Sequence, residues 1–281
     1  WGRDSNLGRS TYEGENPREG ASIDFWVSPE ALASDEVPGQ VTIRITDSGR
    51  QGVREMRDVA VEGGINRVYW DFGYAPAEPV RAPGAAAGGG RGGPPAAPGT
   101  YTATLIAGDH ELSADFRLRG DPEATATQAD YEARTAAALH GREVQTRLNG
   151  MISTILDLRS QIEGLRESVA GRELANGDEV LRVADEGLEM LEMLENELRR
   201  PPPRMGYRQY PRLSEQLSFV VRGITGAQAR PTEGQMQVLG EVEEAIDGRA
   251  ADLQGIIDGP VATLNRLLGG QSRILVGGGG G

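Results

Sequence analysis

The spacing of apolar residues changes near residue 120, and this change constrains the fold more than any other feature of the sequence. Before it, apolar and polar residues alternate, which is typical of half-buried antiparallel strands. After it, apolar residues recur at steps of three and four, which is typical of amphipathic helices. With 281 residues, the chain has room for about two domains. The sequence therefore predicts the α+β class, with a β domain over 1–120 and a helical domain over 121–276.

Several segments of the first half alternate with period two and are bounded by turn residues. They are 21–27, 40–46, 66–72, 100–106 and 112–118. The pattern is clearest in 40–46, where Val41, Ile43 and Ile45 fall on one face. Five or more short strands in this length predict a small Ig-like antiparallel β-sandwich. Residues 75–99, rich in Ala, Gly and Pro, interrupt the pattern, and their composition predicts a mobile loop inserted between two strands.

Four apolar stripes in the second half predict an antiparallel four-helix bundle. The second helix is expected over about 178–199, with Leu188 on its buried stripe. Three prolines at 201–203 end it, because proline cannot donate to the helical ladder. Residues 200–211 then form an irregular connection rich in Pro, Arg and Tyr. Pro260 is expected to kink or end the last helix. The glycine tail at 277–281 contains no fold information.

Composition excludes several kinds of chemistry. The chain has no cysteine, so disulfides, thiolate metal sites and cysteine nucleophiles are excluded. All 29 basic residues are arginine, which excludes a Schiff-base lysine and a P-loop lysine. The two histidines, His110 and His140, are far apart in the sequence, so a histidine-rich metal site is not expected. The net charge of −13 argues against nucleic acid and anionic membranes as partners.

No apolar run approaches the ~18–20 residues of a membrane-spanning helix, so no transmembrane segment is expected. Acidic residues offer two weak readings. A glycosidase-like carboxylate pair would combine Glu13 and Glu15 with Asp24 or Asp71, but turn capping explains the same residues. A calcium site would draw on Asp109, Asp121 and Glu123, but no dense Asp/Asn/Gly loop supplies ~6–8 oxygen ligands. We therefore expect no catalytic residue, no bound metal and no cofactor, and the protein is predicted not to be an enzyme.

Aromatic and basic residues suggest contact surfaces. The three tryptophans, Trp1, Trp26 and Trp70, could form a sugar-binding platform or belong to the sandwich core. The 200–212 stretch is locally basic in an acidic protein, and it is either a solvated linker or a docking site for an acidic partner. The candidate docking residues are Arg200, Arg204, Tyr207, Arg208, Tyr210 and Arg212.

Residues 12–17, with the sequence Tyr-Glu-Gly-Glu-Asn-Pro, begin a pattern that includes 20–23, 64–71 and 98–105. Together these segments resemble the region after the β-propeller in bacterial sortilin-like, BNR-repeat (glycosyl-hydrolase) proteins. In that family, an aromatic-x-Gly-Glu-Asn-Pro segment leads into an Ig-like domain similar to flagellar hook-cap modules, and a helical region ends the chain. The resemblance covers most of the 281 residues. Its motifs are more specific in the first 105 residues than in the helices.

The resemblance implies a secreted or periplasmic, multidomain bacterial protein whose propeller is absent from this chain. A hydrolase site would be expected in the propeller, not here. Because residue 1 is Trp and no signal peptide is found, the chain is expected to be a portion of a longer protein. We expect a non-catalytic structural and protein-interaction module, in one version an accessory subunit on a larger respiratory or photosynthetic envelope complex. The alternatives are the non-catalytic tail of a carbohydrate-active hydrolase and a carbohydrate-binding module.

Overall fold

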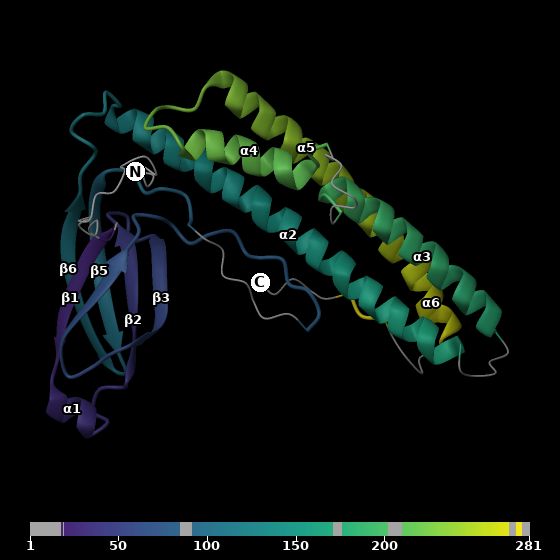
Figure 1. Cartoon of the computed structure of the whole chain (residues 1–281), viewed down its shortest axis with the longest axis horizontal. Helices are drawn as coiled ribbons and strands as arrows, with labels where there is room; N and C mark the ends of the chain where they lie inside the picture. Colours follow the sequence, from purple (N-terminus) through teal and green to yellow (C-terminus); the bar gives the residue numbers. More distant parts are fainter. Residues whose placement is uncertain are drawn as a thin grey trace, which may run out of the picture.

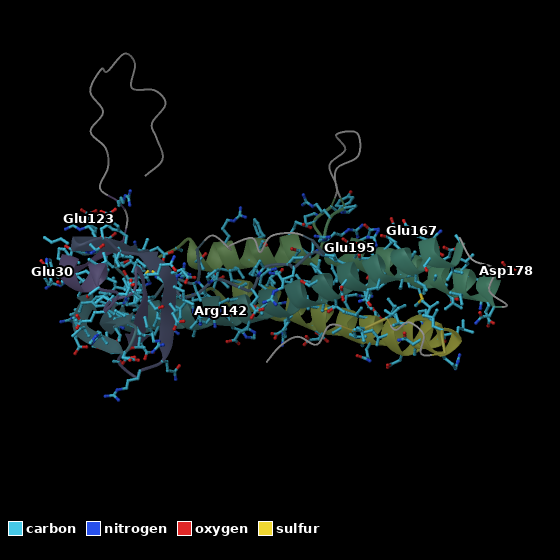
Figure 2. The ribbon with its side chains drawn as sticks, turned by 90° about the horizontal axis from the view of Figure 1, so that it is seen from below. Glu30, Glu123, Arg142, Glu167, Asp178 and Glu195 are labelled. Atoms are coloured by element: carbon cyan, nitrogen blue, oxygen red, sulfur yellow. The ribbon has the colours of Figure 1, made fainter. Side chains whose placement is uncertain are left out.

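The computed structural model describes residues 18, 20–84, 92–170, 176–201, 210–269 and 274–276. Within them, antiparallel sheets form one end of the molecule and long helices extend away from it (Figure 1). Glu30 and Asp178 are labelled near the opposite ends in Figure 2. The predicted α+β class is confirmed.

The strands form two antiparallel sheets. One pairs β1 (Ala21–Val27) with β4 (Gly64–Trp70). The other has the order β3-β2-β5-β6, formed by Gly52–Ala60, Gln40–Asp47, Gly99–Ala107 and His110–Leu118. As alternation predicts, Val41, Ile43 and Ile45 are all buried. Trp70 is also fully buried, and its indole N–H donates to the carbonyl of Gly73 at 2.9 Å.

The sequence did not predict strand β3, because charged residues hide its alternation. Arg54, Glu55, Arg57 and Asp58 follow one another across only five positions. The strand lies at an edge of its sheet, where charged side chains remain in water. Glu55 accepts from Arg44 of the neighbouring strand at 3.0 Å, so this charge also stabilises the strand pairing. The short helix α1 (Pro29–Ala33), whose N-cap is Ser28, was not predicted either.

The four predicted helices are present in the helical half, and they lie along three paths. Its elements are α2 (Gln128–Ala170), α3 (Gly177–Leu198), α4 (Leu213–Thr225), α5 (Glu233–Ile256) and α6 (Ala262–Leu267). Helices α4 and α3 lie one after the other along α2, and α5 packs beside both (Figure 1). One return path is therefore divided into two helices, because the proline-rich connection interrupts it. We call these packed helices the helical rod.

Pro260 neither ends nor sharply separates the last helices. A π-helical turn, Ile257–Val261, accommodates it between α5 and α6. Such a turn lets the helix continue although proline has no backbone N–H to donate. Pro260 lies against Gly187 of α3, where a Cβ atom would be 3.5 Å from it. Gly187 is buried, and Leu188 is half-buried and packs against the core of the rod, on the face predicted to be buried.

Candidate functional site

Much of the predicted mobile loop lies along helix α2. Residues 74–82, here called the strap, are held by side chains of that helix. Thr146 Oγ1 accepts from the backbone N–H of Glu78 at 3.2 Å, and Ser153 Oγ accepts from the N–H of Arg81 at 2.9 Å. Asn149 donates to the carbonyl of Glu78 at 2.6 Å. The insert is a loop between two strands, as predicted, and its strap is hydrogen-bonded to α2; residues 85–91 lie outside the described residues.

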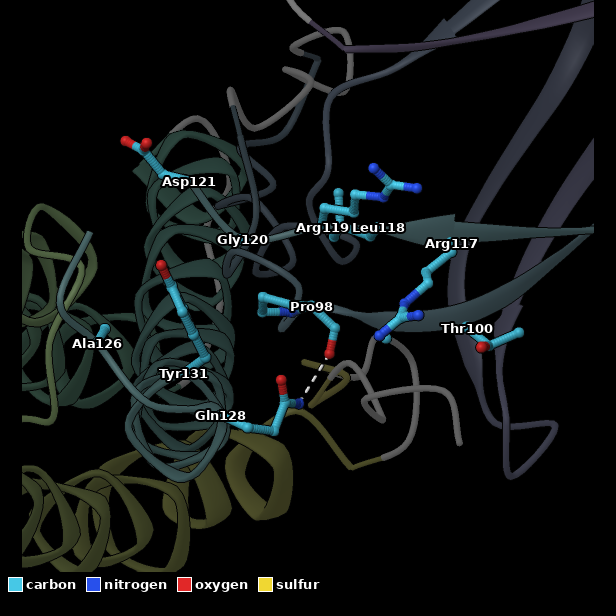
Figure 3. Close-up of a pocket in the computed structure, with 11 residues that line it drawn as sticks. Pro98, Thr100, Arg117, Leu118, Arg119, Gly120, Asp121, Ala126, Gln128 and Tyr131 are labelled. Carbon is cyan, nitrogen blue, oxygen red and sulfur yellow. Dashed lines mark hydrogen bonds between the residues drawn. The ribbon is translucent and has the colours of Figure 1, made fainter. Parts of the chain in front are cut away.

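The end of the same insert joins the sheets to the start of α2. Thr135 donates its hydroxyl to the carbonyl of Pro95 at 2.9 Å. Gln128 donates its side-chain amide to the carbonyl of Pro98 at 2.8 Å, drawn as a dashed line in Figure 3. The carbonyls of Pro95 and Pro98 are thus the acceptors that join this segment to α2. The β unit and the helical rod therefore meet through specific polar contacts.

A cleft lies at this meeting point. It consists of two adjoining hollows of about 750 and 370 Å³. We call them together the junction cleft; the residues that line both are Pro98, Leu118, Arg119, Gly120, Asp121 and Tyr131. Figure 3 shows Arg119, Gly120 and Asp121 on the connection from β6 and Tyr131 on α2. The cleft therefore combines an apolar wall with charged groups from both halves of the chain.

Arg134 lines the smaller hollow and is the charged residue most deeply buried there, with 7% of its surface exposed. Its Nη1 donates to the carbonyl of Ala227 at 3.2 Å, and its guanidinium carbon lies 5.3 Å from the ring centroid of Tyr131. Its buried Nε–H has no hydrogen-bond partner among the residues that the structure describes. Burial lowers the pKa of Arg134, because desolvation penalises the charged form.

Two carboxylates also line the cleft, those of Asp71 and Asp121, and Asp121 is already engaged in hydrogen bonds. Asp121 Oδ1 accepts from the backbone N–H of Glu123 at 2.9 Å, and Oδ2 accepts from Gln228 at 3.4 Å. Gln228 in turn accepts from the hydroxyl of Tyr131 at 2.9 Å. In the described part of the chain, neither Arg117 nor Arg119 nor Arg134 forms an ion pair with a carboxylate. The cleft thus presents unpaired cations in an acidic protein.

The structure describes only part of the predicted docking site at 200–212. Arg204, Tyr207 and Arg208 lie outside the described residues. Glu215 lies between two of the others, since its Oε2 is 3.5 Å from Arg200 Nε and accepts from the backbone N–H of Arg212 at 2.9 Å. Tyr210 is 88% exposed. The described members therefore meet near the start of α4, with the aromatic ring in solvent.

The other candidate residues are scattered. Trp70 belongs to the core, Trp26 is 64% exposed, and Trp1 is outside the described residues. Of the residues proposed for a carboxylate pair, Asp24 accepts two hydrogen bonds from Arg67, both at 2.7 Å, and Asp71 lines the smaller hollow of the junction cleft. Glu13 and Glu15 lie outside the described residues.

The histidines and acidic groups of the described chain do not gather into a metal site. His110 is exposed on β6, whereas His140 lies 2.8 Å from Glu243, between Nε2 and Oε2. Among the described residues, no group of three or more His, Cys, Asp or Glu side chains could hold a metal ion.

Arg134 and the strap are the site features that sequence reasoning missed. A signal for Arg134 was present, because it is three residues after Tyr131 and four before Ala138, on the buried face of α2. Comparisons with protein-family models, curated proteins and solved structures found no significant match. The resemblance to sortilin-like proteins therefore stays a prediction. None of the described helices combines the length and the apolar character that a membrane crossing requires.

Proposed function

We propose that this chain is a non-catalytic structural and protein-interaction module. The observation that supports this proposal most directly is the double attachment of the β unit to α2, through the strap and through the junction. In this proposal the β unit is an Ig-like sandwich that sets the direction of the helical rod. The module belongs to the C-terminal end of a secreted or periplasmic sortilin-like propeller protein.

The attachment extends far along the helix. Gln128 and Ser153 mark its two ends, a separation of 25 residues along α2, which is about 38 Å at the α-helical rise per residue. Neighbouring domains usually move relative to one another unless their interface is extensive. Because hydrogen bonds are distributed along several turns, bending at the junction would break more than one of them. This arrangement suits a rigid module, here called the bracket, in which the β unit and the helical rod keep a fixed separation.

The partner surface is proposed at the start of α4. Tyr210 is 88% exposed and Phe219 is 79% exposed. Arg212 lies between them in the sequence and is also exposed. Tyrosine, phenylalanine and arginine are enriched at protein interfaces. We propose a protein partner in the cell envelope, with a respiratory or photosynthetic complex as the specific version.

Distance measurements between spin labels test the bracket. The chain has no cysteine, so single cysteines can be introduced at the exposed residues Glu111 on β6 and Glu189 on α3. We expect one narrow distance distribution. Removing the strap contacts with Thr146→Ala and Ser153→Ala should broaden it. Thr154→Ala is the matched control, because Thr154 donates to Gly150 of its own helix. A broad distribution in the unaltered chain would contradict the bracket.

Co-purification from envelope extracts tests the partner surface. Phe219→Ala combined with Arg212→Glu should release a partner that the unaltered chain retains. Met193→Ala is a control at another exposed apolar residue, with 55% of its surface accessible. Equal retention by all three chains would exclude this surface.

Trp26 supports a second candidate, the carbohydrate-binding module. It is 64% exposed and pairs across the strands with Ile65, which is 83% exposed. An exposed indole is a common platform for a sugar ring. A glycan array should show hits that Trp26→Ala removes. An array without hits, or hits that the variant keeps, would exclude the carbohydrate-binding function. It would also remove sugar binding as a reason to assign the chain to the tail of a carbohydrate-active hydrolase.

A further inference from the structure

Strand β6 is an open edge of the four-stranded sheet. Among the described strands it pairs with β5 and with no other. All of its residues except Phe116 and Leu118 are exposed, and Leu112 leaves 70% of its surface in solvent. Figure 1 shows β6 on the side of the β unit away from the helical rod, with β3 nearer to the rod. An exposed edge strand is a template for pairing with another chain.

The backbone groups at this edge follow a fixed alternation. A two-residue turn at 108–109 joins β5 to β6, and the pairing continues without a shift from Ala107 and His110 to Gly99 and Leu118. A two-residue hairpin closes on a hydrogen-bonded pair, and such pairs alternate along antiparallel strands. The even-numbered residues of β6 therefore direct their N–H and C=O groups toward β5. The odd-numbered residues from 111 to 117 direct theirs to the free edge.

The charges on β6 are complementary to those of a second, antiparallel β6. When the two strands are centred on Ala114, Glu111 of each copy lies opposite Arg117 of the other. This register also matches the backbone, because the residues that face the free edge then meet one another. In the described part of the chain, neither Glu111 nor Arg117 forms an ion pair. Opposite charges directly across two strands stabilise their pairing.

Neighbouring registers lack this complementarity. Moving the centre to Ser113 places Glu111 opposite Asp115, and moving it to Asp115 places that carboxylate opposite its own copy. Like charges directly opposite each other are destabilising. The charges therefore select the register centred on Ala114.

The same register covers the exposed leucine. Leu112 of each copy lies opposite Phe116 of the other, in a pair without backbone hydrogen bonds, where side chains approach most closely. The ring of Phe116 already packs on Trp70, with 5.8 Å between the ring centroids. A second β6 would therefore extend the apolar core of the β unit across the edge.

We propose that β6 is the dimerisation edge of this protein and pairs antiparallel with β6 of a second copy, about a two-fold axis at Ala114. Each contact then occurs twice, as a two-fold interface requires. The two four-stranded sheets become one continuous sheet, and each helical rod lies on the far side of its own β unit. The proposal goes beyond the bracket function, because it assigns a partner to a surface that the bracket does not use.

Sedimentation velocity of the full chain at several protein concentrations tests the dimer. Near-physiological salt screens the repulsion between chains of net charge −13. We expect a reversible equilibrium of monomer and dimer. Arg117→Glu places like charges opposite each other at both ends of the pairing, and it should weaken dimerisation at least about tenfold. Adding Glu111→Arg to that variant should restore the dimer, because the two charges are then exchanged but still complementary.

Arg57→Glu is the matched control. It makes the same change of charge on β3, at the opposite edge of the same sheet, and should leave dimerisation unchanged. Circular dichroism and the melting temperature show whether each variant folds.

A cysteine cross-link tests the register without changing any charge. The chain has no cysteine of its own, and Ala114 is exposed. Ala114→Cys places two thiols opposite each other in a pair whose Cα atoms are about 4.5 Å apart, within reach of a disulfide. Mild oxidation should therefore give a covalent dimer on a non-reducing gel. Leu112→Cys is the control, because its two copies are four residues apart along the strands, about 14 Å.

Restoration by the charge exchange and preferential cross-linking of Ala114→Cys would support the dimer. A monomer at every concentration, equal weakening by Arg57→Glu and Arg117→Glu, or a folded double variant that stays monomeric would overturn it. Cross-linking of Leu112→Cys as fast as that of Ala114→Cys would also overturn it. In the spin-label test of the bracket, labelled chain is diluted with unlabelled chain, so that only distances within one chain are measured. Either proposal can therefore fail alone.

Discussion

Tyr131, in the first turn of α2, donates its hydroxyl to Oε1 of Gln228 in the connection between α4 and α5, at 2.9 Å. The two residues are 97 positions apart in the sequence. This hydrogen bond joins the start of α2 to the connection between α4 and α5, next to the junction cleft.

Tyr131→Phe should lower the free energy of unfolding by about 1 kcal/mol. The variant keeps the buried ring but removes the hydroxyl and leaves the Gln228 oxygen without its donor. Urea denaturation measures the difference. Tyr210→Phe is the control, because that ring is 88% exposed and should change stability little. Equal effects of the two variants would contradict the assigned bond.

Leu191→Ala should destabilise the rod by about 2–5 kcal/mol, because the substitution leaves a cavity in a packed core. Leu191 is fully buried on α3. Leu188→Ala should cost clearly less, since Leu188 is half-buried. Thermal unfolding followed by circular dichroism at 222 nm compares them. If Leu188→Ala proved the more damaging change, the register of α3 described above would be wrong.

Two glycines of α2 should respond to alanine in opposite ways. At Gly150 a Cβ meets nothing within 4 Å, so Gly150→Ala should stabilise the helix by up to about 1 kcal/mol. At Gly141 a Cβ would lie 2.6 Å from Cγ2 of Val221 on α4. Valine is stiff, so Gly141→Ala should push α4 away and cost about 1–3 kcal/mol. The melting temperatures of the two variants show whether each substitution raises or lowers stability. Stabilisation by both would show that α4 packs less closely against Gly141 than described.

Glu243 should make stability depend on acid pH. Desolvation raises its pKa, but hydrogen bonds from Arg147 and His140 outweigh that effect and hold the pKa below the ordinary value of 4.5. A lowered carboxylate pKa stabilises the fold above pH 4.5, and this contribution is lost as the pH falls through the lowered value. Glu243→Gln should therefore be less stable than the unaltered chain at neutral pH, with the difference shrinking in acid. Glu244→Gln, at an exposed neighbour, should show no such trend in urea titrations at several pH values.

Local patterning was enough to predict the strands and helices whose buried faces are regular. Val41, Ile43 and Ile45 alternate and are buried, and α3 spans Gly177–Leu198, close to the predicted 178–199. Strand β3 was missed because charged residues such as Arg54 and Glu55 hide its alternation, although Val53 is buried and Met56 packs against the core.

The strap and the cleft depend on contacts between distant residues. Glu78 and Thr146 are 68 positions apart, and nothing in the local composition of an Ala/Gly/Pro-rich segment indicates that its backbone will be paired. The burial of Arg134 could be anticipated from its place beside Tyr131 on the helix. The hydrogen bond from its Nη1 to the carbonyl of Ala227 could not, because those two residues are 93 positions apart.

Two of the three helical paths are interrupted, and the interruptions lie at different levels, whereas α2 is continuous. The π-helical turn around Pro260 lies beside Gly187, whereas the break after α3 follows Leu198, near the contact of Glu197 with Arg249. Eleven residues of α3 separate Gly187 from Leu198, about 16 Å at the helical rise. Because the two interruptions lie at different levels, a bending force at either one meets continuous helix in the other two paths of the helical rod. Lengthening the segment after Leu198 should therefore leave the bending stiffness of the helical rod unchanged.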